Sequence, residues 1–175
     1  MRGLRSPPVS KHHRTLQYCT DIAALRNATE FCDENMTSAA KHLPRPLPLA
    51  RPRYHLLSPP QPVFTFVHPN ADDPIDNNRA ISMTFPRRAE DGAGELHGFA
   101  GYFEAELYPG VTLSTHPPTH TPNMFSWFPI FFPLREPVLL PAGAAVEAHV
   151  WRVVGAHKVW YEWAVTAPQA TAVHN

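Results

Sequence analysis

A short proline-flanked stretch carries the side chains best suited to binding a ligand. Residues 122 to 133 read PNMFSWFPIFFP and hold five aromatic residues within eight positions: Phe125, Trp127, Phe128, Phe131 and Phe132. If this stretch is a strand, both of its faces are apolar, and Pro129 and Pro133 make it an edge strand or a broken one. An aromatic edge can accept an extended peptide by strand addition, and Trp127 can stack on a flat cation such as a guanidinium. The alternative is core packing beside one protected edge, which the composition alone favours.

A pair of carboxylates is the second candidate for chemistry. Glu104 and Glu106 are two residues apart in a segment that alternates like a strand, so both carboxylates would share one face. Such a pair can act as a general acid and base. A solvated outer face of a sheet explains the same spacing, and it is the interpretation that we adopt.

Histidine and acidic residues do not form a metal-binding pattern. His116 and His120 have the i,i+4 spacing of a helical zinc pair, but the prolines of their HPPTHTP segment prevent a helix. Residues 72 to 79, DDPIDNNR, miss the spacing of an EF-hand calcium loop and are typical of a turn-forming loop. We therefore expect no metal site.

Nucleotide-binding and nucleophile motifs are also missing from the sequence. Gly92 and Gly94 lead into a predicted strand, whereas a dinucleotide fingerprint places its glycines between a strand and a helix. No nucleophile elbow and no phosphate-cradling loop is present. We assign no catalytic residue.

Composition excludes two classes of partner. Lysine plus arginine and aspartate plus glutamate each number 15, so no basic field exists to attract nucleic acid directly. No run approaches the roughly 20 apolar residues of a membrane span, and the N-terminus lacks the apolar core of a signal peptide. Two cysteines, Cys19 and Cys32, make no disulfide framework, which indicates reduced thiols and a cytoplasmic and nuclear protein.

Proline content separates the chain into two regions. The 21 prolines amount to about 12% of the chain against a usual ~5%, and seven of them lie between residues 44 and 62. We predict a poorly ordered extension and proline-rich linker over residues 1–53, followed by one domain over residues 54–175. Residues 15–31 show weak helical periodicity, which allows a short helix there.

The second region has the pattern of an all-β fold. Residues 96–108, 145–154 and 158–166 alternate with period two, and turn sequences stand at 108–111, 141–144 and 155–157. Short strands at such spacing predict an antiparallel β-barrel or sandwich.

Long segments in this region resemble one known family. GFAGYFE, MFSWFPI and KVWYEWAVTAP, together with FTFVHPN and IDNNR, closely resemble the C-terminal β-barrel of the symmetric-dimethylating protein arginine N-methyltransferase 5 family. The resemblance covers Tyr54 to Asn175. It departs at Pro52, where the family has a histidine near the barrel entrance.

The resemblance implies a division of labour. In the family, a Rossmann-like domain before the barrel binds S-adenosylmethionine and holds two glutamates that grip the substrate arginine, and a further N-terminal domain binds a WD-repeat partner. This chain shows neither, so the resemblance implies no cofactor site here and no methyl transfer by the chain alone. Glu104 matches a barrel-strand glutamate and not the catalytic pair. By the same resemblance, Ser126, Trp127 and Phe128 are substrate-binding, with Trp127 stacking on the arginine of a peptide.

Three hypotheses follow from these observations. The first is the barrel and oligomerisation domain of an arginine methyltransferase, which contacts an arginine-containing peptide, a second copy or the catalytic domain. The second is a non-catalytic module that binds a full-length methyltransferase. The third is a structural remnant without a partner. We adopt the first.

Overall fold

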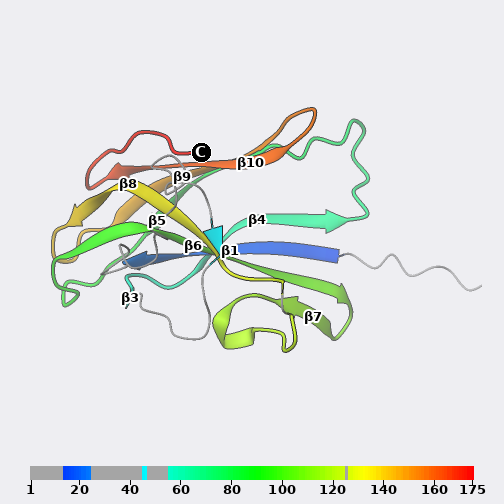
Figure 1. Ribbon diagram of the computed structural model, residues 1–175, viewed down its shortest axis with the longest axis horizontal. Coiled ribbons are helices and arrows are strands. Elements are labelled where there is room, and N and C mark those ends of the chain that lie inside the picture. The colour runs from blue at the N-terminus through cyan, green and yellow to red at the C-terminus, as the bar shows by residue number, and fades with distance from the viewer. Residues whose placement is uncertain (1–13, 25–44, 47–54, 125) are drawn as a thin grey trace, which may run out of the picture.

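Two antiparallel sheets make up the part of the chain that the computed structural model describes, namely residues 14–24, 45, 46, 55–124 and 126–175. The larger sheet contains β1 (Arg14–Ala24), β2 (Arg45–Pro46), β3 (His55–Leu56), β4 (Gln61–His68), β6 (Gly94–Tyr108), β7 (Val111–Ser114) and β8 (Ile130–Leu140). The smaller sheet contains β5 (Arg79–Phe85), β9 (Val146–Val154) and β10 (Val159–Ala167). One turn of 3-10 helix, η3 (Pro117–Thr119), lies between β7 and β8. Figure 1 shows this arrangement.

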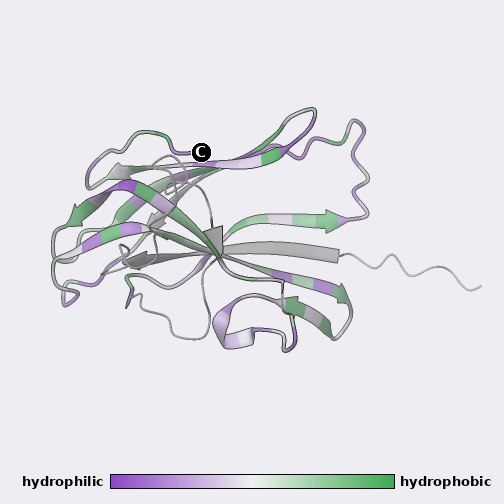
Figure 2. Ribbon diagram, in the orientation of Figure 1, coloured by the Kyte–Doolittle hydropathy of each residue, from purple (hydrophilic) through white to green (hydrophobic). Residues whose placement is uncertain are grey.

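A single apolar core joins the two sheets. Its buried residues come from both: Val63, Phe64, Phe66, Leu96, Phe99, Leu134, Val138 and Leu140 from the larger sheet, and Met83, Phe85, Val146, Ala148, Val150, Trp163 and Val165 from the smaller. In β9 and β5 the buried residues alternate with exposed ones, as a half-buried sheet requires. Hydrophobic and hydrophilic residues accordingly alternate along strands such as β5 (Figure 2). The antiparallel all-β prediction is confirmed.

Among the described residues, β6 is the longest strand, and it organises the larger sheet. It pairs with β1 and β8, and its second half also pairs with β7. The β6–β8 register shifts between Leu96 and Gly98. A side chain at Gly98 would meet the Phe132 carbonyl oxygen and the Phe131 ring, so close backbone approach requires glycine here.

The three predicted turns are all present. Residues 108–111 connect β6 to β7, and Gly110 adopts φ +83°. Residues 141–144 connect β8 to β9, with Gly143 at φ +69°. The β9–β10 hairpin closes when the Gly155 N–H donates to the Lys158 carbonyl at 2.9 Å. Positive φ at two of these turns explains why glycine occupies them.

The larger sheet also includes residues on the N-terminal side of the expected boundary at residue 54. Strand β1 pairs with β4 along one edge and with β6 along the other. The short helix considered for residues 15–31 is therefore wrong for the described residues 14–24. Threonine, tyrosine and isoleucine at 15, 18, 20 and 22 are strand-forming residues, and two partner strands outweigh a weak helical period. The rest of the expected extension lies outside the described residues, apart from β2.

No helix in the described part of the chain has the length and apolar character needed to cross a membrane.

Candidate functional site: an apolar ledge before strand β8

The candidate substrate residues lie in a loop and not in a strand. Ser126 is in a turn, Trp127 to Pro129 are irregular, and β8 begins only at Ile130. Ile130 pairs with β6 on one side and with β2 on the other, so the start of β8 is no free edge. Within the stretch of residues 122 to 133, the expected edge strand is therefore wrong for the described residues 126–129, whereas residues 130–133 do belong to a strand, β8.

Local turn chemistry explains why this stretch leaves the sheet. Pro122 and Asn123 form a turn, and Asn123 has φ 63°. Proline followed by a residue with positive φ fits a type II turn, and asparagine tolerates that conformation. A second turn follows, in which the Trp127 N–H points to the Met124 carbonyl at 3.4 Å. Strand pairing cannot begin before Ile130, because the preceding residues form two turns and the buried Pro129 has no N–H to donate.

The loop is fixed to the end of β7 by paired hydrogen bonds. The Thr121 N–H donates to the Ser114 carbonyl at 3.0 Å, and the Ser114 N–H donates to Thr121 Oγ1 at 2.9 Å. Ser114 is buried, so these bonds are shielded from water. These bonds fix the loop to the larger sheet at Thr121, a few residues before Trp127.

Glu104 also holds this segment, which corrects its assignment to a solvated face. Its Oε1 accepts the Thr119 hydroxyl at 2.8 Å and the Ser114 hydroxyl at 3.3 Å. The Ser114 Oγ in turn accepts the His116 N–H at 3.0 Å. Glu106 is exposed, as the alternation of β6 predicts. The sequence shows that both carboxylates share a face, but only the fold brings η3 against one of them.

Three exposed apolar side chains at the start of β8 are the candidate binding residues, which we call the apolar ledge: Trp127, Phe128 and Ile130. All three are exposed, and Trp127 retains 52% of its accessible surface. The Trp127 ring rests against Phe103 of β6, with ring centroids 5.0 Å apart and planes at 57°. Ser126 is exposed immediately before Trp127. A large ring that is held by a neighbouring ring and half-exposed is a suitable surface for a flat cation.

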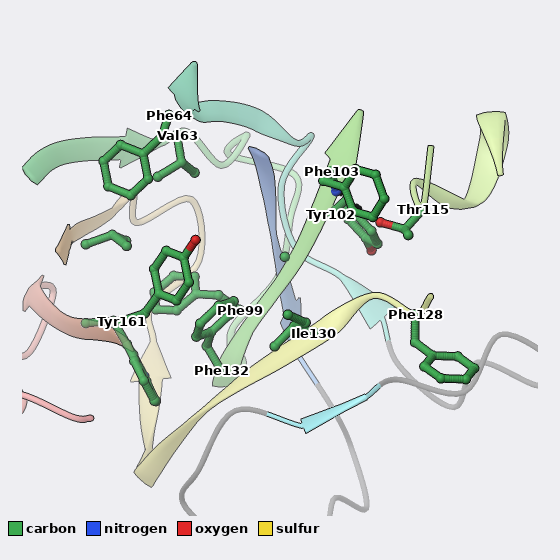
Figure 3. A pocket seen from close by; sticks show the side chains of 13 residues that line it. Val63, Phe64, Phe99, Tyr102, Phe103, Thr115, Phe128, Ile130, Phe132 and Tyr161 are labelled. Atoms are coloured by element: carbon green, nitrogen blue, oxygen red, sulfur yellow. Dashed lines mark hydrogen bonds between the residues drawn. The ribbon is translucent and has the colours of Figure 1, made fainter. Parts of the chain in front are cut away.

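A small apolar cavity opens beside the ledge. Its volume is about 50 Å³, and Phe128 and Ile130 line it together with Phe99, Phe132 and Tyr161. Figure 3 shows the rings of Phe99, Phe132 and Tyr161 gathered between the strands, whereas Phe128 lies apart from them and turns away. The cavity is therefore largely a gap within the core, and the accessible surface of the site is the ledge.

None of the three ledge side chains is titratable. Resolved pKa shifts in the described part of the chain fall on Asp76 and Asp91, in the β4–β5 and β5–β6 loops. Backbone N–H donation from Asn78 lowers the pKa of Asp76, and that from Arg88 lowers the pKa of Asp91. Neither belongs to the ledge. No cluster of three or more potential metal ligands occurs among the described residues.

S-adenosylmethionine, which the family resemblance implies for the intact enzyme, does not fit the described residues. Sites of the Rossmann type need a glycine turn that leads from a strand into a helix. The helical structure described consists of the three-residue η3 alone, and the Gly92–Gly94 turn leads into β6. No step of methyl transfer is therefore assigned to this part of the chain.

The sequence groups Ser126, Trp127 and Phe128 as candidates, but it does not reveal Ile130 or the residues that support the loop. Phe103, which carries the Trp127 ring, was visible only as one of several apolar residues along β6. Glu104 was visible only as one of two acids. The signal that distinguishes them is long-range: β6 and the β7–β8 loop are neighbours in space because β7 folds back on β6.

The fold and the ledge together define a class of protein. This is an all-β domain of two antiparallel sheets that carries several exposed apolar side chains. Comparison with known proteins then gives the family. Residues 19–175 match the PRMT5 oligomerisation domain, and the chain belongs to that family.

The relatives are protein arginine N-methyltransferases. The chain is 55% identical to protein arginine N-methyltransferase 5 of Oryza sativa subsp. indica over 119 residues, which cover 68% of this chain and 18% of the relative. It is 45% identical to the Xenopus laevis protein over 151 residues, or 86% of this chain and 23% of that protein. Protein arginine N-methyltransferase skb1 of Schizosaccharomyces pombe is 41% identical over 115 residues, 61% of this chain and 18% of that protein. The chain thus spans less than a quarter of these relatives, in their C-terminal part.

Proposed function

We propose that this chain supplies the oligomer contacts and one wall of the substrate site of a protein arginine methyltransferase. The substrate is an arginine-containing peptide, and the apolar ledge is the surface that meets it. In this proposal Trp127 stacks on the guanidinium, and Ser126 and Phe128 contact the peptide beside it. The cofactor and the carboxylates that grip the arginine belong to a part of the enzyme outside these 175 residues.

One observation carries the proposal, namely the exposed Trp127 ring that rests on Phe103. A tryptophan normally buries its large apolar surface in a core, as Trp163 does here. Trp127 instead stays about half-exposed while its ring contacts Phe103 at 5.0 Å between centroids. A guanidinium is flat, weakly hydrated and attracted to the electron-rich face of an aromatic ring. The relatives' name, arginine N-methyltransferase, supports arginine as the cation.

Peptide titration followed by NMR tests the role of Trp127. The purified chain is titrated with a glycine–arginine peptide and, separately, with the same peptide carrying citrulline, the uncharged analogue of arginine. We expect saturable shifts of the Trp127 indole N–H and the Ser126 and Phe128 amides with the arginine peptide. Cation–π contact at an exposed site contributes about 0.5–1 kcal/mol, so citrulline and Trp127→Ala should each weaken binding about two- to fivefold.

A matched control separates stacking on Trp127 from nonspecific binding to exposed aromatic side chains. Tyr108 is 53% exposed, close to the value for Trp127, and lies at the β6–β7 turn. Tyr108→Ala should leave the affinity unchanged, and Trp127→Phe should retain part of it. Equal binding of the arginine and citrulline peptides, or full binding by Trp127→Ala, would contradict the proposal.

A further inference from the structure

Two arginines meet over one aromatic ring at the beginning of the smaller sheet. Arg79 of β5 and Arg152 of β9 are direct cross-strand partners. Their guanidinium carbons lie 5.2 and 5.0 Å from the centre of the Phe66 ring, and Phe66 belongs to the larger sheet. We call these two residues the arginine pair. The β4–β5 loop that leads into Arg79 projects from the body of the molecule (Figure 1).

Backbone carbonyls of that loop hold the arginine pair in place. Nη1 of Arg79 donates to the carbonyls of Asp76 and Asn78, both at 2.7 Å, and Nη1 of Arg152 donates to the Asn77 carbonyl at 2.6 Å. A guanidinium has five N–H donors. Only the Nη1 atoms of the pair donate within the described residues, and Nε and Nη2 of both arginines have no acceptor there. Several N–H groups of the arginine pair are therefore held in place without an acceptor among the described residues.

The arginine pair has no close acidic partner among the described residues, although Arg79, after the hydrogen bonds from Asn78, does help to lower the pKa of the nearby Asp76 carboxyl. Neither guanidinium forms an ion pair with a carboxylate of the described residues. Asp76 is the acid beside Arg79 in sequence, but its Oδ1 accepts the backbone N–H and the side-chain amide of Asn78, both at 2.8 Å. Arg88, in contrast, pairs with Glu90 and Asp91. Like charges directly opposite one another in a sheet are unfavourable unless something neutralises them.

We propose that the arginine pair binds an oxyanion, either a carboxylate from a second copy of the chain or a free phosphate. Guanidinium groups match the two oxygens of a carboxylate or phosphate with parallel N–H donors. Here the stacking on Phe66 and the Nη1 bonds orient both groups in advance, so little side-chain entropy is lost on binding. The site is separate from the apolar ledge, and its existence does not depend on the proposed function.

NMR of the arginine side chains tests this site with inorganic phosphate as the probe. The full chain is titrated with phosphate against chloride at matched ionic strength, and the Nε–H signals of Arg79 and Arg152 are followed. Saturable shifts of both signals are expected. A hydrogen bond to a charged group contributes about 1.5–3 kcal/mol, so Arg79→Gln or Arg152→Gln should weaken binding about tenfold or more. Arg88→Gln, which removes an arginine that has its own acidic partners, should change nothing.

Sedimentation velocity of the same samples identifies the source of the oxyanion. If phosphate or Arg152→Gln lowers the degree of self-association while Arg88→Gln does not, the natural ligand is a carboxylate of a second copy. Saturable phosphate binding without any change in association identifies a free oxyanion. Arg152→Lys keeps the positive charge and the alkyl chain but loses the planar guanidinium. Its phosphate affinity should lie between those of the unmodified chain and Arg152→Gln. Such an intermediate value would show that the loss of binding in Arg152→Gln is not caused by unfolding. The absence of a saturable shift in the unmodified chain, together with unchanged association of Arg152→Gln, would overturn the proposal.

Discussion

His174 shows how one residue near the end of the chain completes the contact between the two sheets. The β6–β8 register shift leaves the Arg135 N–H of β8 without a strand partner, and it donates to His174 Nε2 at 2.9 Å. His174 itself exchanges backbone hydrogen bonds with Trp163 of β10, at 2.8 and 3.1 Å, and stacks on its ring. The Trp163 indole N–H then donates to the Pro133 carbonyl at 3.0 Å. His174 and Trp163 thus join β8 to β10.

Replacing His174 should destabilise the fold. His174 is 3% exposed, and His174→Ala leaves the Arg135 N–H unpaired and opens a gap beside Trp163. An unsatisfied partly buried donor costs about 1–3 kcal/mol, so the free energy of unfolding should fall by at least that amount. Urea denaturation measures the change. Val173→Ala, at a neighbouring side chain that is 55% exposed, should stay within about 0.5 kcal/mol. Equal stability of the two variants would show that the His174 contacts with Arg135 and Trp163 do not stabilise the fold.

At the scale of elements, β6 positions the loop that carries the ledge. Glu104 accepts hydroxyl hydrogen bonds from η3 and from the end of β7, and Phe103, its neighbour in β6, supports Trp127 on the other face. The Phe103 N–H donates to the Thr115 hydroxyl at 3.0 Å, which adds a further tie. The same strand therefore fixes both the loop and the ring.

Glu104→Ala should loosen the β7–β8 loop without unfolding the sheets. The substitution removes the acceptor for the Thr119 and Ser114 hydroxyls, so amides that depend on this segment, such as that of Thr119, should exchange faster with deuterium. Hydrogen–deuterium exchange measures the effect. Glu106→Ala serves as the matched control, because Glu106 lies on the same strand and is exposed. Similar exchange in both variants would exclude a positioning role for Glu104.

The whole molecule has two properties that favour association. Its formal net charge is zero, so copies approach one another without long-range repulsion. Large apolar side chains are exposed on several elements: Leu56, Val67, Ile75, Tyr108, Trp127, Phe128, Ile130, Leu139, Val154, Val159 and Val173. Membership of an oligomerisation-domain family gives these features a common explanation.

The purified chain should therefore self-associate. Sedimentation equilibrium over a dilution series should give a mass that is a multiple of 19.6 kDa and falls toward one unit on dilution. Apolar contacts drive this association, so moderate salt should weaken it little. A single 19.6 kDa species at all concentrations would contradict self-association of this domain by itself.

The sequence alone determined the fold class, the turns and the family. Period-two alternation in β9 and β10 and glycine at 110 and 143 are local signals, because strand faces and positive φ depend on a residue and its immediate neighbours. Grouping Ser126, Trp127 and Phe128 was possible for the same reason, since they are adjacent in the chain.

The tertiary structure alone decided how those residues are presented. Whether Trp127 lies in a strand or a loop depends on which partners reach β8, and only the fold shows β2 and β6 beginning their pairing at Ile130. The inclusion of β1 in the larger sheet, the support from Phe103 and the meeting of Arg79 with Arg152 are likewise contacts between distant segments. Such contacts leave no local pattern, because backbone pairing and ring packing join residues according to the path of the chain in space.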